Sequence, residues 1–301
     1  MSKSSSPDEA NDAGSNEPAP PLETHQSGGN STMSTPTWLP GELPVDMPNQ
    51  ARMYDYLLGG YHNFAIDRSA AEQLIAINPD TPLIMQSYRA FLRRAVRFLV
   101  AQGIDQFLDL GSVTPTVGST HEVAQQLNPD ARVVYVDIDP DTVLHSEAIL
   151  RDTPHTAVIQ ADIRQLDQIL AHPDARRLLD FSQPVAVLFA LLHFVTEDEQ
   201  AYNLVHVLRN ALPPASCFAI SHGTYEETPS EVTERVEALY ARSTTPVKLR
   251  SRAEVAAFFD GLDLVEPGLI YEPLWRPEGP DDLFLDQPER SATFVGVGCK
   301  P

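Results

Sequence analysis

Three acidic side chains follow short apolar runs, each at the point where a parallel strand would end. Asp109 lies in the run FLDLG, Asp137 closes RVVYVD and Asp162 closes AVIQAD. Because the carboxyl ends of parallel strands meet at one edge of a sheet, we expect these carboxylates to lie close together. Carboxylates accept hydrogen bonds from ribose hydroxyls and from an exocyclic amine. The pattern therefore predicts an adenosine-containing ligand, without separating a dinucleotide from S-adenosylmethionine.

The neighbours of these acids also suit a nucleotide. Gly111 and Ser112 follow the first acid, and a turn of small residues lets backbone amides approach a ligand. Ile138 and Ile163 follow the next two acids, and an aliphatic side chain there can cover an adenine ring. An alternative role for residues 137–140 is an N-cap before a helix that starts with proline.

Two histidines follow the next two apolar runs and are the candidate catalytic residues. His193 lies in LLHF and His222 lies in SHG. An imidazole with a pKa of about 6.5 can remove a proton at neutral pH, which a hydroxyl or acid acceptor of a transferred group would require. A histidine alone at a strand end is more often structural than catalytic, so both interpretations stay open.

A helical pattern over residues 48–101 precedes these runs and supplies further candidate contacts. Arg89 can hold a ligand carboxylate with two guanidinium nitrogens, or it can belong to a solvated basic face with three other arginines of the same helix. The segment YDYLLGGYHNF contains a glycine pair that permits a bend, and its Tyr54 and Asn63 offer aromatic and polar contacts. Ordinary helix packing would explain this segment equally well.

After Gly103 the pattern changes to short β-branched runs that alternate with helical ones. The runs predict strands at 106–110, 132–137, 157–162, 184–190, 217–221, 262–270 and 291–298. Helical spacing occurs at about 117–127, 140–150, 197–212, 230–242 and 251–260. Strands that alternate with helices indicate βαβ units and a mostly parallel sheet. The last two strands have no helix between them, which predicts an antiparallel hairpin at the sheet edge.

Composition and charge exclude several classes of protein. The chain has 301 residues and a formal net charge of −21, which argues against nucleic acid or an anionic membrane as its partner. No apolar run approaches the ~18 residues of a membrane span, and the N-terminus lacks a signal-peptide core, so we expect a cytoplasmic protein. Cys217 and Cys299 lie far apart, and we expect two reduced, buried thiols. No metal motif is readable, since His121 has no second histidine at zinc spacing.

The chain is expected to divide into three parts. Residues 1–45 are rich in serine, proline, asparagine and acids, and such a segment buries too little apolar surface to offset the entropy of ordering. We therefore expect a disordered acidic tail at 1–45, a helical cap section at 46–103 and a Rossmann-like ligand-binding domain at 104–301.

Many segments, in order, resemble the actinobacterial-type family of S-adenosylmethionine-dependent methyltransferases, formerly a domain of unknown function. They are ARMYDYLLGGYHNFAIDR, RAFLRRAVRFL, QFLDLGS, THEVAQ, RVVYVDIDP, VIQADIR, LLHFV, SHGT, YARSTTPVKLRSRAEVAAFFDGLDLVEPGL and WRPEGP, and together they span about residues 48–300. The resemblance implies an α/β class I methyltransferase fold: a Rossmann-like, mostly parallel seven-strand sheet with an antiparallel edge hairpin, plus an N-terminal helical section. Val113 departs from the family, which carries a second loop glycine there, and Tyr88 stands where the family tends to carry asparagine.

The resemblance implies S-adenosylmethionine as cofactor and leaves the acceptor unassigned. The expected function is therefore methyl transfer to an unidentified small-molecule acceptor. An alternative is a non-catalytic regulatory protein that binds S-adenosylmethionine or S-adenosylhomocysteine, which the missing loop glycine favours. A nicotinamide-dependent oxidoreductase fits less well, because the Gly-x-Gly-x-x-Gly pattern is absent and the sheet is expected to end in antiparallel strands.

Overall fold

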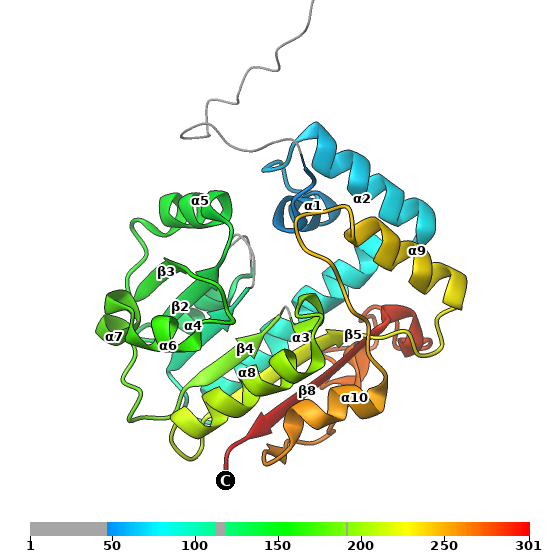
Figure 1. Ribbon diagram of the computed structural model, residues 1–301. Helices are drawn as coiled ribbons and strands as arrows, with labels where there is room; N and C mark the ends of the chain where they lie inside the picture. Colours follow the sequence, from blue (N-terminus) through cyan, green and yellow to red (C-terminus); the bar gives the residue numbers. More distant parts are fainter. Residues whose placement is uncertain (1–46, 112–117, 191) are drawn as a thin grey trace, which may run out of the picture. The chain divides into compact units, whose positions relative to one another are not determined.

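The computed structural model describes residues 47–111, 118–190 and 192–301 (Figure 1). The predicted tail at 1–45 lies outside these ranges, and so do the loop residues Ser112 and Val113. None of the described helices combines the length and the apolar character that crossing a lipid bilayer requires.

The described residues form one sheet with helices on both sides. Its strands are β1 (Gln106–Leu110), β2 (Arg132–Asp137), β3 (Thr156–Gln160), β4 (Ala186–Phe189), β5 (Cys217–Gly223), β6 (Asp263–Leu264), β7 (Ile270–Tyr271) and β8 (Thr293–Cys299). The α-helices are α1 (Gln50–Leu57), α2 (Ala65–Ile77), α3 (Thr81–Ala101), α4 (Thr120–Leu127), α5 (Pro140–Leu150), α6 (Leu166–Ala171), α7 (Pro173–Leu178), α8 (Asp198–Ala211), α9 (Ser230–Tyr240) and α10 (Arg252–Ala256). Short 3-10 turns complete the described elements: η1 (Leu192–Phe194), η2 (Ala257–Phe259), η3 (Glu272–Leu274) and η4 (Pro288–Ser291).

The strand order confirms the predicted fold class. Along the sheet the order is β3-β2-β1-β4-β5-β8-β6, with β7 also paired to β8. The pairs among β1 to β5 are parallel, whereas β8 is antiparallel to β5, β6 and β7. The prediction of one continuous strand at 262–270 was wrong, because the chain leaves the sheet between β6 and β7. Pro267 in that interval has no amide hydrogen to donate to a neighbouring strand.

Successive side chains of the strands face two different apolar layers. On one side of the sheet, Leu108 and Val134 pack with residues of α6, α7, α8 and η2. On the other side, Phe107 and Val133 pack with residues of α3 and α4. The alternation follows from the two-residue period of a strand, and burial of each large apolar side chain contributes about 1.5–3 kcal/mol. The sheet is thus a rigid platform for whatever lies at the ends of its strands.

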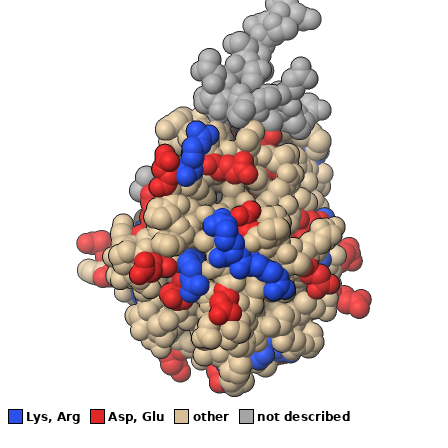
Figure 2. All heavy atoms as spheres, turned by 90° about the vertical axis from the view of Figure 1, so that its left-hand side faces the viewer, with Lys and Arg blue, Asp and Glu red and all other residues tan. Residues whose placement is uncertain are grey.

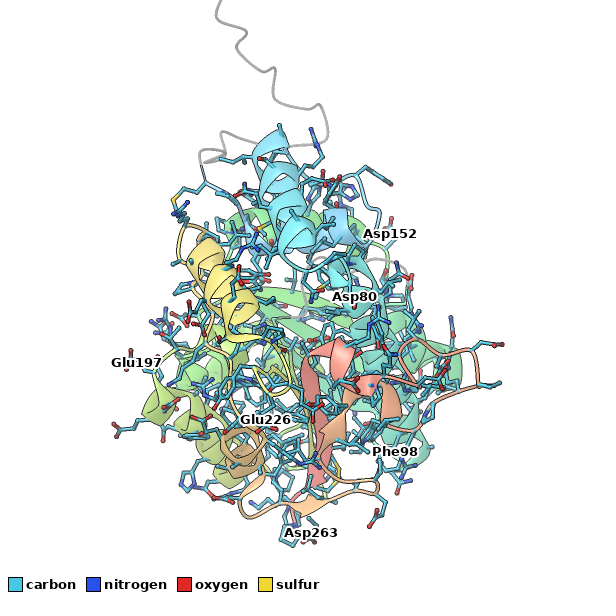
Figure 3. The ribbon with its side chains drawn as sticks, turned by 90° about the vertical axis from the view of Figure 1, so that its right-hand side faces the viewer. Asp80, Phe98, Asp152, Glu197, Glu226 and Asp263 are labelled. Carbon is cyan, nitrogen blue, oxygen red and sulfur yellow. A yellow bond between two sulfur atoms is a disulfide. The ribbon has the colours of Figure 1, made fainter. Side chains whose placement is uncertain are left out.

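The loop between β7 and β8 packs on α3 (Figure 3). The Arg276 guanidinium lies 4.2 Å from the centroid of the Phe98 ring. Nη2 of Arg290 lies 2.7 Å from Oδ1 of Asp80, just before the helix begins. These contacts hold both ends of α3 and thereby fix the helix that carries Arg89.

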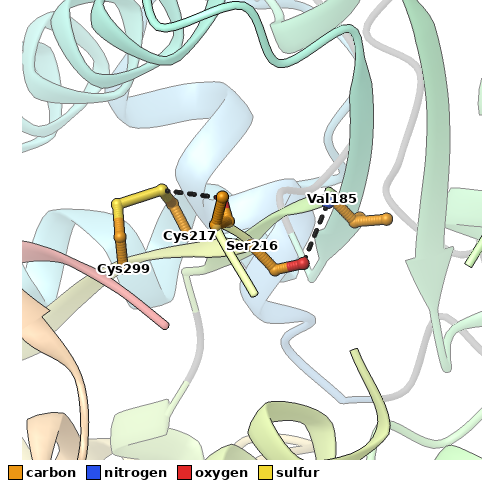
Figure 4. The surroundings of a disulfide bond; sticks show 5 residues. Val185, Ser216, Cys217 and Cys299 are labelled. Carbon is orange, nitrogen blue, oxygen red and sulfur yellow. Dashed lines mark hydrogen bonds between the residues drawn. A yellow bond between two sulfur atoms is a disulfide. The ribbon is translucent and has the colours of Figure 1, made fainter. Parts of the chain in front are cut away.

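The two cysteines form a disulfide bond, so the prediction of reduced thiols was wrong (Figure 4). Cys217 begins β5 and Cys299 ends β8, and the two residues stand directly opposite each other in the antiparallel ladder. They are 82 residues apart in the sequence. The pairing was not visible in the sequence because it depends on β8 returning to lie beside β5.

Candidate functional site

Two cavities lie near the carboxyl ends of the strands. The larger, called cavity one, has a volume of about 440 Å3. Its walls come from the ends of β1, β2 and β3, from the segment after β4, and from two segments distant in the sequence. The lining residues are Asn49, Gln50, Ala51, Gly111, Val136, Asp137, Ile138, Asp139, Pro140, Asp162, Ile163, Arg164, Phe194, Val195, Thr196, Glu197, Gln200, Thr244, Thr245 and Pro246.

Asp137 is the acidic residue in cavity one with the most perturbed environment. Its Oδ1 accepts a hydrogen bond of 2.9 Å from the amide of Asp139. Burial raises the pKa of Asp137 to about 7, and the charges of Asp139 and Asp109 act in the same direction. A carboxylate that has lost water in this way gains strongly from ligand hydroxyl donors, because they replace the missing solvation.

Asp162 and Ile163 follow β3, which ends at Gln160, and both line cavity one. Arg164 holds Asp162 with hydrogen bonds of 2.5, 2.8 and 2.9 Å, and these bonds lower the pKa of the carboxyl. Asp162 is therefore ionised at neutral pH and can still accept from an amine. Ile138, which is 55% exposed, lies next to Asp137, and Ile163 lies next to Asp162. Each provides an aliphatic surface against which a flat ring can pack.

Gly111 connects cavity one to a second cavity. Its φ of +86° is a left-handed conformation that a side chain would strain, and its amide donates to the carbonyl of Val136 at 2.9 Å. The loop that continues from it contains Ser112 and Val113, which lie outside the described residues. The proposed roles of these two residues therefore remain predictions from the sequence.

Cavity two has a volume of about 180 Å3 and mostly apolar walls. It shares three lining residues with cavity one: Gln50, Gly111 and Phe194. The other lining residues are Tyr54, Leu57, Ile84, Met85, Tyr88, Ala190, His193, Ser221, Gly223, Val236, Tyr240, Val247, Leu249, Ser291, Ala292 and Thr293. Two cavities that share wall residues can hold two molecules close together, which favours a reaction between them.

His193 lies in the turn η1 and lines cavity two. Its Nδ1 is buried and makes no hydrogen bond within the described part of the chain. Burial holds the pKa of His193 well below its usual value, and nearby His222 and Arg250 lower it further. The imidazole is therefore neutral at pH 7, and a neutral imidazole can accept a proton or a hydrogen bond.

His222 has a different environment and lines neither cavity. One ring nitrogen, Nδ1, lies 2.7 Å from the carbonyl of Gly223, and the other, Nε2, lies 2.8 Å from Nη1 of Arg250. With Nδ1 protonated and Nε2 accepting from the guanidinium, both nitrogens are occupied by the protein. The structure thus places the two predicted catalytic histidines in unlike positions, with only His193 at a cavity wall.

Of the remaining predicted site residues, some line a cavity and others are held within the protein. Tyr54 lines cavity two, and the guanidinium of Arg89 lies 5.5 Å from the centroid of its ring. Arg89 itself lines neither cavity. Asp109 is buried, and its Oδ2 accepts a 2.6 Å bond from Oγ1 of Thr120 at the start of α4. Asn63 is also buried and donates 2.8 Å to Oδ2 of Asp55, so it stabilises the turn between α1 and α2.

Several lining residues were not predicted. Asn49 caps α1 by accepting from the amide of Arg52 at 3.1 Å, and its own amide group donates 2.5 Å to Oδ2 of Asp139. The sequence signals the cap, because asparagine precedes a helix, but not the contact across the cavity. Thr244 and Thr245 lie in an irregular segment, and a local sequence pattern does not predict where such a segment lies in the fold.

Charges of both signs are mixed on the face formed by α5, α6 and α7 (Figure 2). One exposed arginine there, Arg177, is paired with Asp174 at 2.8 Å. The cavities therefore do not owe their character to a strong field from this face. Their local side chains decide what they can hold.

Comparison with known proteins agrees with this arrangement. The sequence pattern of the family described as S-adenosyl methyltransferase matches residues 36–301. A solved structure of a DUF574 family protein from Streptomyces avermitilis is 37% identical with a TM-score of 0.81, over 85% of this chain and 99% of that one. A proposed methyltransferase from Thermobifida fusca is 40% identical with a TM-score of 0.79, over 85% of this chain and 96% of that one. No curated protein matches significantly. The chain therefore belongs to the S-adenosyl methyltransferase family.

Proposed function

We propose that this protein binds S-adenosylmethionine in cavity one and transfers its methyl group to a small molecule in cavity two. The observation that carries the proposal is the meeting of the two cavities at Gly111, with acids and aliphatic side chains on one side and an apolar wall with a neutral histidine on the other. S-adenosylmethionine supplies a methyl group bonded to a sulfonium sulfur. A nucleophile can attack the methyl carbon and displace the sulfur. The residues of the chain provide binding and alignment for that displacement.

Each wall of cavity one suits a different part of the cofactor. Asp137 can accept from the two ribose hydroxyls, and Asp162 can accept from the exocyclic amine of adenine. Ile138 and Ile163 can pack against the adenine ring. Arg89, whose guanidinium lies beside the ring of Tyr54, is proposed to bind the carboxylate of the methionine end.

A non-catalytic binding protein is the second candidate, supported by Val113 in place of a loop glycine. Such a protein would bind the cofactor and leave every acceptor unchanged. A nicotinamide-dependent enzyme would instead bind NAD in cavity one.

The test begins with titration calorimetry of the full chain against S-adenosylhomocysteine and, separately, NAD. We expect micromolar affinity for the first, about −8 kcal/mol, and no heat with the second. Asp137→Ala should weaken binding at least tenfold, while Asp152→Ala, an exposed acid just after α5, should not. Equal affinity of both variants and wild type would remove Asp137 from the ribose site.

Turnover separates the enzyme from the binding protein. S-adenosylhomocysteine formation is measured over a panel of small acceptors, with protein lacking acceptor as the blank. Tight cofactor binding without turnover on any acceptor would favour the regulatory role.

A further inference from the structure

Cavity two contains no side chain of fixed charge among its described lining residues. Its walls are mainly aliphatic and aromatic, formed by Leu57, Ile84, Met85, Tyr88, Ala190, Phe194, Val236, Tyr240, Val247 and Leu249. The nearby cation Arg89 stacks on the Tyr54 ring and does not line the cavity. An ionic molecule would therefore lose its water here without gaining a partner of opposite charge, which costs several kcal/mol.

Three buried polar atoms at cavity two make no hydrogen bond within the described residues. They are the hydroxyl oxygens of Tyr54 and Tyr88 and Nδ1 of His193. Ser221 lies close to the Tyr88 hydroxyl and Arg89 close to the Tyr54 hydroxyl, so the imidazole nitrogen is the atom with the clearest unmet hydrogen bond. Buried polar atoms are nearly always paired in folded proteins, and a ligand group is the natural partner for one at a cavity wall.

We infer that cavity two takes an uncharged acceptor with an aromatic or similarly apolar skeleton, and that a hydroxyl group on it receives the methyl group. This inference rests on the proposed function. The volume of about 180 Å3 lies below the roughly 300–1,000 Å3 of pockets for drug-sized ligands, so the acceptor is small. A protonated amine and a carboxylate are both disfavoured by the absence of a charged partner in the wall.

The hydroxyl must lose its proton as it is methylated. The hydroxyl oxygen forms a bond to the methyl carbon while the carbon–sulfur bond of the donor breaks, and the electron pair of that bond stays on sulfur. The hydroxyl proton passes to Nδ1 of His193, which makes no hydrogen bond to any residue that the structure describes. Since His193 precedes Phe194, which lines both cavities, the base stands near the junction at which donor and acceptor meet.

The helix α9 offers a way to fill cavity two while leaving the two apolar layers of the sheet unchanged. None of its residues is buried, yet Val236 lines the cavity. Val236→Trp should occupy the space, and Ala238→Trp on the same helix is a matched control because Ala238 is exposed and lines neither cavity.

The experiment uses the full chain saturated with S-adenosylhomocysteine, at neutral pH. Saturation-transfer NMR then measures binding of three matched probes: 4-ethylphenol, 4-ethylbenzoate and 4-ethylbenzylamine. We expect the phenol to bind at least tenfold more tightly than either ion. Its signal should disappear in Val236→Trp and persist in Ala238→Trp.

Two variants of His193 separate positioning from proton transfer. The side-chain oxygen of His193→Asn can replace Nδ1 as a hydrogen-bond acceptor but cannot take the proton. This variant should keep phenol binding and lose methylation of any phenol that wild type turns over. His193→Phe should bind the phenol about tenfold less tightly, the loss expected for one buried hydrogen bond.

The failures of the two proposals are distinguishable. Absence of S-adenosylhomocysteine binding by wild type would reject the proposed function itself. If S-adenosylhomocysteine binds but the phenol does not, or if an ionic probe binds as well as the phenol, the acceptor class is overturned and the proposed function stands. A phenol signal that survives Val236→Trp would place the phenol outside cavity two and also overturn the inference.

Discussion

Nη1 of Arg250 lies 2.8 Å from Nε2 of His222, and both side chains are completely buried. Burial lowers the pKa of His222 to about 3, so the ring is neutral and accepts from the guanidinium. The same guanidinium donates to the carbonyls of Leu192 at 3.4 Å and Val195 at 2.9 Å, which lie on either side of His193 and Phe194 in the sequence. Arg250 and His222 therefore hold the backbone on both sides of His193, the candidate base.

Arg250→Met should lower the free energy of unfolding by about 3–5 kcal/mol, because it leaves several buried acceptors without a donor. Urea unfolding measures the change. Lys248→Met is the control, because Arg250 and Lys248 both pair with Asp198, at 2.9 and 2.8 Å. Lys248 lies partly in solvent, where such a pair is worth less than about 1 kcal/mol. Similar losses in both variants would contradict the positioning role of Arg250.

Binding of S-adenosylhomocysteine should strengthen as the pH rises toward neutrality. The pKa of Asp137 is raised from 3.8 to about 7, and ribose hydroxyls bind the ionised form better. Affinity should therefore increase about tenfold between pH 6 and pH 8 and change little above that, as measured by calorimetry. Asp137→Asn should bind more weakly and lose this dependence; a variant that keeps the full pH profile would assign it to another group.

The raised pKa of Asp137 also makes the stability of the unliganded protein fall as the pH rises. Its folded state holds a proton on Asp137 that the unfolded state releases between pH 3.8 and about 7. The contribution of this group to stability is therefore present below the lower value and is lost as the pH rises through the upper one. Asp137→Asn should gain stability relative to wild type at pH 8 and not at pH 4, measured by urea unfolding at both values.

Reduction of the disulfide should destabilise the fold. Cys217 and Cys299 close a segment of 82 residues, for which chain entropy predicts about 4–5 kcal/mol. Urea unfolding with and without dithiothreitol tests this, and the double variant Cys217→Ala, Cys299→Ala should not respond to reductant. Two thiols that react with a thiol reagent in the native, unreduced protein would show that the bond is absent.

Two truncations test the expected tail. The family match begins at residue 36, whereas composition predicts a dispensable segment up to residue 45. A chain starting at residue 36 should keep the melting temperature and S-adenosylhomocysteine affinity of wild type, and so should one starting at residue 46. A drop of many degrees in only the shorter chain would show that residues 36–45, including Trp38, contribute to folding.

The sequence was most informative where local pattern and ligand chemistry coincide. Asp137 and Asp162 were both predicted to end a strand; Asp137 does end β2, Asp162 follows β3 by two residues, and both line cavity one. The fold class and the family are confirmed. Periodicity identifies a strand and its end to within about two residues, so residues that follow parallel strands can be assigned to one edge of the sheet.

The unpredicted features depend on how distant segments meet. No local pattern shows that β8 lies between β5 and β6, and the disulfide follows from that insertion. The distinction between His193 and His222 has the same origin, because it depends on Arg250, which lies 28 residues beyond His222 in the sequence. The assignment of catalytic and cofactor-binding roles remains a set of predictions for the variants described above.

The exposure of α9 bears on how this family could diversify. The wall that would distinguish one acceptor from another includes α9, on which no residue is fully buried, although Val236 and Tyr240 pack against the apolar cluster of α1 and α2. Mutations at Val236 or Tyr240 therefore change partly buried contacts of this smaller cluster and leave the two apolar layers of the sheet intact. Relatives that share the sheet and cavity one could thus act on different compounds, and a library randomised only along α9 should yield mostly folded proteins with altered acceptor preference.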